Sequence, residues 1–369
     1  KFGLKITILE KKPAHQSKKN SHDQRTIAIS EGTKKFFEKI NIWNDINLFS
    51  EPIKKIRVID RKIVNKLDFD NSRRESNLGY IVKNKELLNI LYKKIRNSKN
   101  IKLFENVKIS SIQQSNNSVS TFFNKSTLVS NLNIAADGKN SLVRKMLKTP
   151  LFSKNYNKKA FVITFTHSND HKNTAFEFFF KNGPLAILPM QKIKENYASS
   201  IIWTNENNFL NDLINMSEEK IISILNKEIN FCIGDIKKIV SKQLFNLSAH
   251  LNSKFYEKRL IYIGDSAHSF HPIAGQGWNL GMKDLETLTK ISEKYKSLGL
   301  ELGDNLFCKE YHDKTFYKAY RLFQITDKLD NIFKIQNSIL SFTRSSGLNF
   351  IQNNKKIKNI ISDFAMGIN

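Results

Sequence analysis

Hydrophobic and polar residues follow two different periods along this chain. Short apolar runs rich in β-branched residues indicate strands, because such side chains favour an extended backbone. The first run, 2–9 (FGLKITIL), predicts a buried strand of a parallel sheet that ends at Glu10. Two later runs end at an acidic residue in the same way: 132–136 before Asp137, and 260–263 before Asp265.

Other segments place apolar residues three to four positions apart, which is the period of a helix with one buried face. The clearest is 84–96. Weaker examples are 280–291 and the chain after Asp304, where Gly347 is an expected stop. Thr33 is expected to cap the N-terminus of a helix that follows it.

Residues 160–204 contain four successive strand-like runs, FVITFTHS, TAFEFFF, PLAILPM and YASSIIW. Short spacings and turn residues between them predict an antiparallel sheet. Similar patterns at 53–69, and around a turn at 115–117 within 101–123, predict further strands. An α/β unit is thus interrupted by an antiparallel sheet and completed by helices. The cleft between two such units is a common place for a ligand.

Composition narrows the class of protein. The 369 residues are 40% hydrophobic and 11% aromatic, which is enough apolar surface for two or three domains and excludes a disordered chain. Two unrelated cysteines, Cys232 and Cys308, exclude a disulfide framework or a cysteine-based zinc site and fit a reducing compartment. No apolar run reaches the roughly 18 residues of a membrane-spanning helix. The chain begins with Lys rather than Met, so we expect its natural start to lie upstream.

The net charge is +26, from 60 Lys and Arg against 34 Asp and Glu. Nucleic-acid binding requires clustered cations, and here lysines are spread through the whole chain, so we expect no nucleic-acid partner. The tail differs, because Lys355, Lys356 and Lys358 flank an apolar stripe of Ile357, Ile360, Ile361 and Phe364. That pattern is typical of a helix on an anionic membrane, but a terminal helix docked on the core with its charges in water fits equally.

Acidic residues at strand ends are the first candidates for chemistry. In a dinucleotide-binding unit, an acid about 20 positions after a glycine loop accepts hydrogen bonds from a ribose, and Glu10 suits that role. The glycine loop itself is not in this sequence. Asp137 and Gly138, followed by Ser141 and Arg144, form a second candidate, since glycine lets the backbone approach a phosphate closely. A plain Asp-Gly turn has the same sequence.

The third candidate is the segment 261–281, IYIGDSAHSFHPIAGQGWNLG. Asp265 follows a strand directly and suits the polyol part of a cofactor. The loop after it leads to a helix expected to begin near Asn279, whose N–H groups and positive dipole end would stabilise an anionic ligand atom. The pattern is not GxGxxG, because position 280 is Leu. The loop residues expected to border the ligand are Pro272, Gly275, Gln276, Gly277 and Asn279.

Together these segments resemble the FAD-dependent aromatic hydroxylases typified by para-hydroxybenzoate hydroxylase. The matching pieces are DSAH at 265–268 with HP at 271–272 and GQG at 275–277, ADG at 136–138, and Asp23-x-Arg25-Thr26. Within that group the chain is most similar to the ubiquinone-biosynthesis hydroxylases. Those features are RTIAIS followed by GT, LGYIV at 78–82, Arg321 with Thr326-Asp327, and Arg344.

The resemblance implies an α/β fold with an FAD-binding Rossmann-like domain of the glutathione-reductase and para-hydroxybenzoate-hydroxylase type. An antiparallel-sheet substrate domain would interrupt it, and the C-terminus would be helical. The expected boundaries are 1–50, 84–150 and 258–303 for the FAD-binding domain, without its first strand and glycine loop; 51–83 and 151–257 for the substrate domain; and 304–369 for the C-terminal helical region.

The implied activity is hydroxylation of the aromatic ring of a polyprenylphenol in ubiquinone biosynthesis, through a C4a-hydroperoxide of reduced FAD. Molecular oxygen would be the second substrate, and NAD(P)H or a redox protein the reductant. The implied localisation is cytoplasmic with peripheral membrane association. The implied partners are the membrane surface and other quinone-biosynthesis enzymes. Three alternatives stay open: another flavin monooxygenase, an epoxidase of the same fold, and a degenerate flavoprotein acting as a basic binding protein.

The resemblance also implies roles for the candidate residues. Glu10 would bind the adenosine ribose and the Val107 backbone would lie near the adenine. Arg25 would lie by the flavin and pyrophosphate, Asp265 would hold the ribityl-pyrophosphate region, and 272–279 would border the isoalloxazine ring. Asp137 and Gly138 would support the pyrophosphate side. No residue is singled out as catalytic, and His268 with His271 lacks the further ligands of a metal site.

Overall fold

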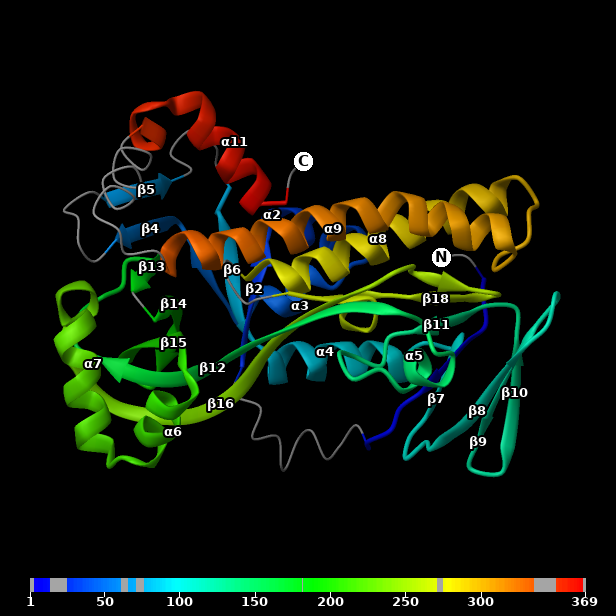
Figure 1. Cartoon of the computed structure of the whole chain (residues 1–369), viewed down its shortest axis with the longest axis horizontal. Helices are drawn as coiled ribbons and strands as arrows, with labels where there is room; N and C mark the ends of the chain where they lie inside the picture. Colours follow the sequence, from blue (N-terminus) through cyan, green and yellow to red (C-terminus); the bar gives the residue numbers. More distant parts are fainter. Residues whose placement is uncertain are drawn as a thin grey trace.

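The computed structural model describes residues 3–13, 25–60, 66–70, 76–180, 182–270, 275–334 and 350–367. Its main feature is a sheet of eight strands in the order β19-β16-β12-β15-β14-β13-β4-β5 (Figure 1). These strands are β4 (Lys55–Asp60), β5 (Lys66–Asp70), β12 (Leu151–His167), β13 (Thr174–Phe180), β14 (Gly183–Ile193), β15 (Asn196–Glu206), β16 (Ile236–Asn252) and β19 (His268–Ser269).

Four smaller sheets surround it. Two contain parallel pairs: β1 (Ile6–Leu9) with β7 (Ile101–Phe104), and β11 (Asn133–Ala135) with β18 (Leu260–Tyr262), which also pairs with β17 (Tyr256–Glu257). The other two are antiparallel: β2 (Thr26–Ser30), β6 (Gly79–Lys83) and β3 (Ser50–Ile53), and then β8 (Ile109–Gln114), β9 (Val119–Phe123) and β10 (Ser126–Ser130).

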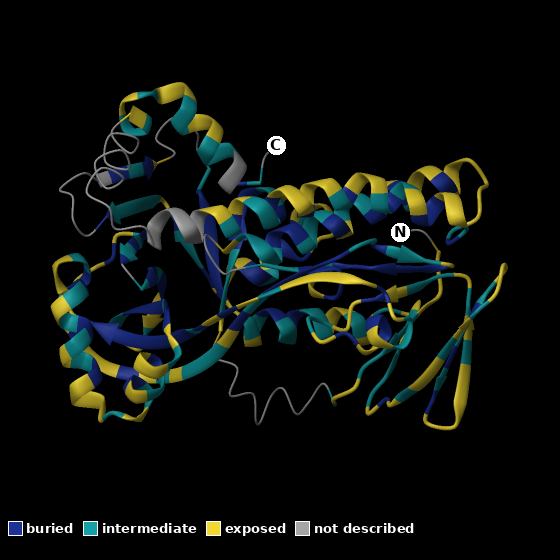
Figure 2. Ribbon diagram, viewed as in Figure 1, coloured by how far each residue is buried: buried dark blue, intermediate teal, exposed yellow. Residues whose placement is uncertain are grey.

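Helices cover these sheets. The helices are α2 (Glu31–Lys39), α3 (Trp43–Asn47), α4 (Asn84–Arg96), α5 (Leu142–Met146), α6 (Asn207–Asn215), α7 (Glu218–Ile233), α8 (Gln276–Ser297), α9 (Asn305–Lys334) and α11 (Lys355–Ala365), with a 3-10 turn η1 (Gly264–Ser266). Figure 1 shows α6 and α7 beside one end of the large sheet, and α8 and α9 running together over β11 and β18. Their inner faces are buried and their outer faces exposed (Figure 2).

The period-2 pattern of the large sheet divides its side chains between two faces. One face, carrying Phe161, Ile163 and Phe178, packs with Leu213 and Ile229 of α6 and α7 in one apolar cluster. The other face is shared between a cluster that contains Ala28 of β2 and a smaller one that contains Phe323 of α9. That second face therefore looks toward the rest of the molecule.

Most elements that local pattern predicted are present. The helix 84–96 has the bounds of α4, and the strands within 160–204 form the expected antiparallel sheet. The expected cap at Thr33 is wrong, because Ser30 caps α2 and its Oγ accepts from the Thr33 N–H at 3.3 Å. The strand expected at 2–9 is the shorter β1, which is partly exposed rather than buried, because in the described chain β1 pairs on one side only, with β7.

The C-terminal segment is docked on the core. The backbone N–H of Gly32 donates to Met366 O at 2.9 Å, and Met366 is 1% exposed in a cluster with Ile53 and Ile81. Lys355 and Lys356 remain in solvent. Gly347, the predicted stop, lies outside the described residues. No helix in the described part of the chain is long and apolar enough to cross a membrane.

Candidate functional site

The turn after β18 joins two of the predicted motifs. Its Ile263 N–H donates to Ala135 O at the end of β11 at 3.0 Å, and the Ser266 hydroxyl bonds to Ile263 O at 2.9 Å. From the other motif, Arg144 Nη1 donates to Ser266 O at 3.0 Å. The segments that follow β11 and β18 are therefore held side by side, at the carboxyl ends of neighbouring parallel strands. In open α/β sheets, ligands bind at this end of the strands.

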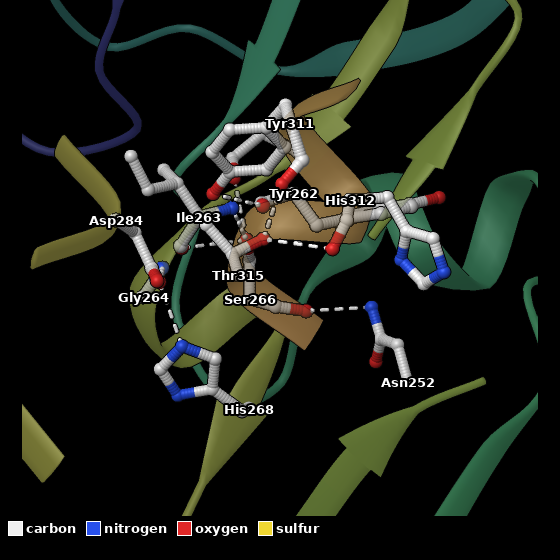
Figure 3. A network of polar contacts seen from close by, with 11 residues as sticks. Asn252, Tyr262, Ile263, Gly264, Ser266, His268, Asp284, Tyr311, His312 and Thr315 are labelled. Carbon is white, nitrogen blue, oxygen red and sulfur yellow. Dashed lines mark hydrogen bonds and ion pairs between the residues drawn. The ribbon is translucent and has the colours of Figure 1, made fainter. Parts of the chain in front are cut away.

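The same turn is fixed on α8 (Figure 3). The buried His268 Nε2 lies 2.7 Å from Asp284 Oδ2, which also accepts from the Gly264 N–H at 3.2 Å. A Cβ on Gly281 would lie 3.2 Å from the Cα of Gly264, so the turn and the helix approach at a distance that suits glycine. His268 is thus a structural partner of α8. Within the described ranges, no cluster of three or more His, Cys, Asp or Glu side chains could hold a metal ion.

Asp265 lies in this turn, and we call the partly enclosed place around its side chain the Asp265 recess. Its side chain is accessible to solvent although protein surrounds most of it, and this burial raises its pKa against the attraction of His268, Lys139 and Arg25. Burial likewise lowers the pKa of Lys139, against the attraction of Asp265. The Arg25 guanidinium lies 5.5 Å from the centre of the Phe245 ring. One acid and two bases from three distant segments therefore meet here.

The Asp137 turn forms one wall of this region. Asp137 Oδ2 accepts from the N–H groups of Leu142 and Val143 at 2.7 and 3.1 Å and so caps α5. Gly138 has a φ of +81°, and a Cβ added to it would meet no heavy atom within 4 Å. A ligand can therefore approach its backbone closely, although a plain Asp-Gly turn would have the same open space and φ.

Buried Arg144 stiffens the same wall. Its Nη2 donates to Lys139 O at 2.7 Å and its Nη1 lies 3.1 Å from His250 Nε2. Burial and the Arg144 charge lower the pKa of His250 to about 3, so this histidine is neutral and accepts the bond. Positive charge beside the recess is therefore carried by Arg144 and Lys139.

The loop before α8 contains His271 and the predicted Pro272, which lie outside the described residues. The helix begins at Gln276, three residues earlier than expected, after Gly275 in a left-handed conformation with a φ of +59°. Gly275 is exposed, whereas Gln276 and Gly277 are half-buried in the first turn. The first N–H groups of a helix have no partner within it, so this end suits an anionic atom.

Asn279, which was predicted to border the ligand, forms hydrogen bonds with β2 and α2. Its Oδ1 accepts from the Ser30 N–H at 2.9 Å and from Thr33 Oγ1 at 3.0 Å, and its Nδ2 donates to Ala28 O at 2.8 Å. The side chain is 5% exposed. Its polar atoms are engaged within the protein, so it positions the first turn of α8 against β2.

Glu10 and Val107 form a separate pair at the ends of β1 and β7. The Val107 N–H donates to Glu10 O at 2.9 Å, and the Glu10 N–H donates to Phe104 O at 2.8 Å. The Glu10 carboxylate is half-buried and accepts from the Lys12 N–H at 3.1 Å. The two residues predicted to bind one end of a cofactor are thus adjacent. In the described chain no hydrogen bond links them to the Asp265 recess.

Glu177 was missed by reasoning from motifs. It lies on β13, on the second face of the large sheet, and its burial raises its pKa to about 7. The sequence feature that could have identified Glu177 is that it is the single acid within the apolar run TAFEFFF.

Replacing Glu177 by glutamine should remove a pH dependence of stability. In the folded protein this acid keeps its proton up to about pH 7, whereas the unfolded value is 4.5. The folded state therefore binds the extra proton between these values, and the free energy of unfolding falls as pH rises through that window. We expect Glu177→Gln to flatten this fall by about 3 kcal/mol in urea unfolding at a series of pH values, because one pKa unit corresponds to about 1.4 kcal/mol. The exposed Glu219→Gln is the control, and equal slopes for both variants would contradict the prediction.

Comparison with known proteins agrees with this geometry. A family model described as FAD binding domain matches residues 1–298, which is most of the chain. The chain belongs to the FAD binding domain family. Ubiquinone hydroxylase UbiL of Rhodospirillum rubrum is 25% identical to it over 366 residues, covering 99% of this chain and 84% of the relative. Ubiquinone biosynthesis monooxygenase COQ6 of Dictyostelium discoideum is 26% identical over 428 residues, covering 99% and 86%.

Solved structures share the fold. The p-nitrophenol 4-monooxygenase PnpA from Pseudomonas putida DLL-E4 matches with a TM-score of 0.77 at 13% identity, over 98% of both chains. Klebsiella pneumoniae HpxO complexed with FAD and uric acid matches with a TM-score of 0.70 at 13% identity, over 98% of this chain and 97% of that chain. The expected fold class and the expected resemblance to FAD-dependent aromatic hydroxylases are both confirmed.

The residues around the recess fit FAD. Asp265 offers a solvent-accessible carboxylate for hydroxyl groups, and the open space at Gly138 accommodates a phosphate against the backbone. Lys139 and Arg25 supply positive charge close to Asp265. Gly275, the residue before the first turn of α8, is exposed. The Asp265 recess therefore has the hydrogen-bond donors, the acceptor and the open space that a polyol diphosphate requires.

Proposed function

We propose that the intact protein is an FAD-dependent monooxygenase that hydroxylates the aromatic ring of a polyprenylphenol in ubiquinone biosynthesis. The family match and the FAD-compatible recess at Asp265 carry the cofactor part of this proposal. The substrate part rests on the relatives named ubiquinone hydroxylase and COQ6 monooxygenase, which align with almost the whole chain. NAD(P)H or a redox protein would be the reductant.

For the cofactor, Asp265 would bind hydroxyl groups of the ribityl-pyrophosphate region, and Arg25 would lie by the flavin and pyrophosphate. Asp137 and Gly138 would line the pyrophosphate side, while Glu10 and the Val107 backbone would hold the adenosine end. The helix start and the loop before it would border the flavin ring through Pro272, Gly275, Gln276 and Gly277, and Asn279 would keep that helix start in place.

FAD, when bound, supplies the activation of molecular oxygen. The protein's own part is to orient the phenol and to exclude water from the reacting atoms. The first turn of α8 offers N–H groups and a positive dipole end that favour negative charge, and Asn279 holds that turn in place against β2. The second face of the large sheet would cover the substrate.

This assignment divides the chain into three proposed units. Residues 1–50, 84–150 and 258–303 would form the FAD-binding domain, and 51–83 with 151–257 the substrate domain. Residues 304–369 would form the C-terminal helical region. The packing of Met366 against residues of β3 and β6 supports a tail that joins the last unit to the substrate domain.

The deciding experiment uses the full-length protein. We expect a visible flavin spectrum after purification, together with consumption of NAD(P)H and oxygen that depends on a polyprenylphenol. Mass spectrometry should find one oxygen atom added on the ring fragment of the product. Oxygen on the prenyl chain would instead favour the epoxidase. A colourless protein whose nucleic-acid affinity falls steeply with salt would favour the basic binding protein.

We also propose peripheral attachment to an anionic membrane through the outer face of α11, since a polyprenylphenol resides in the bilayer. Lys355 and Lys356 are exposed there, and Ile360 is 55% exposed. The inner face contributes Ile361 to the core, so the helix is docked and also presents a basic, partly apolar outer surface.

The pair Lys355→Glu and Lys356→Glu should weaken vesicle binding at least about tenfold, because each basic residue near an anionic surface is worth about 1 kcal/mol. Flotation with phosphatidylcholine vesicles, with and without phosphatidylglycerol, measures this. Substitution is preferable to truncation, because truncation removes the buried Met366. The matched control is Lys227→Glu with Lys237→Glu, an equal charge change on exposed positions of α7 and β16. Equal loss of flotation in both pairs would exclude a specific role of α11.

A further inference from the structure

Besides Asn252 Oδ1 at the end of β16, three side-chain oxygen atoms on the described part of the large sheet have no hydrogen-bond partner, although they are closed off from solvent. They are Ser200 Oγ on β15, and Ser241 Oγ and Gln243 Oε1 on β16. Ser200 is 0% exposed. A buried polar group without a partner costs about 1–3 kcal/mol, so a cluster of them in one place requires an explanation.

Strand register places all three on the same face. Ser200 pairs with Thr164 on β12, and Thr164 pairs with Ser241 on β16, so these residues form a row across three strands. Gln243 lies two positions from Ser241 on the same strand, which returns it to the same face about 7 Å away. The three orphaned oxygens therefore form one polar strip on the second face of the sheet.

Apart from Thr164 within the row, the residues that pair with this polar strip are apolar. Val162 pairs with Gln243 and with Ile202, and Leu188 pairs with Ser200. An apolar side chain in place of each polar one would fit this environment without leaving an unpaired group. The arrangement therefore suits a ligand with a few oxygen substituents on an otherwise hydrophobic body.

The face that carries the polar strip continues along β16 to Phe245, which lies beside Arg25. Phe245 lies two positions beyond Gln243 on β16 and hence on the same face. The Arg25 guanidinium lies over the Phe245 ring, and Arg25 is in turn attracted to Asp265. A molecule on the strip would therefore lie beside the residues to which the flavin is assigned.

We propose that Ser200, Ser241 and Gln243 bind the oxygen substituents of the aromatic ring of the polyprenylphenol, and so select the ring that faces the flavin. The inference rests on the proposed function and adds to it the residues that recognise the substrate head group. Each hydroxyl accepts from a ring hydroxyl or donates to a ring oxygen, and the Gln243 carbonyl accepts from a ring hydroxyl. The apolar side chains between them contact the ring and the start of the prenyl chain.

The test compares Ser200→Ala, Ser241→Ala and Gln243→Met with Ser153→Ala and Gln113→Met, which lie at exposed strand positions. FAD content by absorbance first shows that the cofactor site is intact. The Kd of the polyprenylphenol, from the change it causes in the flavin spectrum, should rise about tenfold in each strip variant, which corresponds to about 1.4 kcal/mol. A prenylbenzene without ring oxygens should bind wild type and variants equally.

Thermal unfolding separates recognition from a structural role. Removing an orphaned buried hydroxyl should leave the ligand-free Tm unchanged or higher in Ser200→Ala and Ser241→Ala, whereas a hydroxyl with a structural bond would lower it. A lower Tm with unchanged Kd would overturn the inference. If wild type binds FAD but not the polyprenylphenol, the proposed function fails. If wild type binds the phenol and the variants keep its Kd, the inference alone fails.

Discussion

Replacing Asn279 by leucine should abolish FAD retention and lower the free energy of unfolding by about 3–5 kcal/mol. The substitution leaves the Ser30 N–H and Ala28 O without their partners in a buried place, and each unpaired group costs about 1–3 kcal/mol. It also frees the first turn of α8 from β2, so the N–H groups assigned to the flavin lose their position. Urea unfolding and the visible absorbance of the purified protein measure the two effects.

Two variants make this result interpretable. Asn279→Asp keeps the acceptor for Ser30 and Thr33 but loses the donor to Ala28, so it should fall between wild type and the leucine variant. Asn230→Leu makes the same substitution at an exposed position of α7 and should change neither property. A stable, colourless Asn279→Leu protein would mean that Asn279 contacts the cofactor rather than positioning the helix.

The second large effect is expected at Gly32. A Cβ there would lie 2.2 Å from Gly367 O, and the Gly32 N–H holds Met366 O at 2.9 Å. Gly32→Ala must therefore displace the end of the chain and expose Met366. We expect a loss of about 2–4 kcal/mol in unfolding free energy, since burial of a Met side chain accounts for most of that range. Limited proteolysis should cleave the C-terminal segment faster than in wild type.

A double-mutant cycle tests whether the contact of Gly32 with the end of the chain causes this loss of stability. In a chain that ends at residue 365, Gly32→Ala should cost almost nothing further, because the carbonyl it clashes with is absent. Gly32 lies in α2 without a positive φ, so backbone strain does not contribute to its effect. Gly299→Ala measures the cost of strain alone, since its added Cβ meets no atom within 4 Å and its φ is +68°. If truncation and Gly32→Ala add independently, the contact with Met366 and Gly367 is not what makes Gly32 necessary.

Local sequence pattern was sufficient for much of the architecture. The helix at 84–96 and the antiparallel strands between 160 and 204 follow from the spacing of apolar residues, which repeats over a few positions. The acids Asp137 and Asp265 could be placed at strand ends for the same reason. Motif order along the chain also led to the FAD-dependent family, because residues that approach phosphates and polyols are restricted to a few types at short spacings.

Other features needed contacts between distant parts of the chain. Asn279 has the spacing of a cofactor residue, yet its partners are 246 to 251 positions away and make it a positioning residue. Ser30 rather than Thr33 caps α2, because the cap is set by where the chain enters the helix. The roles inferred for Glu177 and for the unpaired oxygens of Ser200 and Ser241 depend on which face of the large sheet these side chains occupy.

The amino-acid order was thus enough to establish the elements, the fold class and the kind of cofactor, since these depend on periodicity and on short motifs. The three-dimensional arrangement was needed to learn which side of the large sheet faces the Asp265 recess, and that the tail is docked through Met366. The physical reason is that periodicity reports which side of a helix or strand is apolar. What covers that side depends on residues hundreds of positions away.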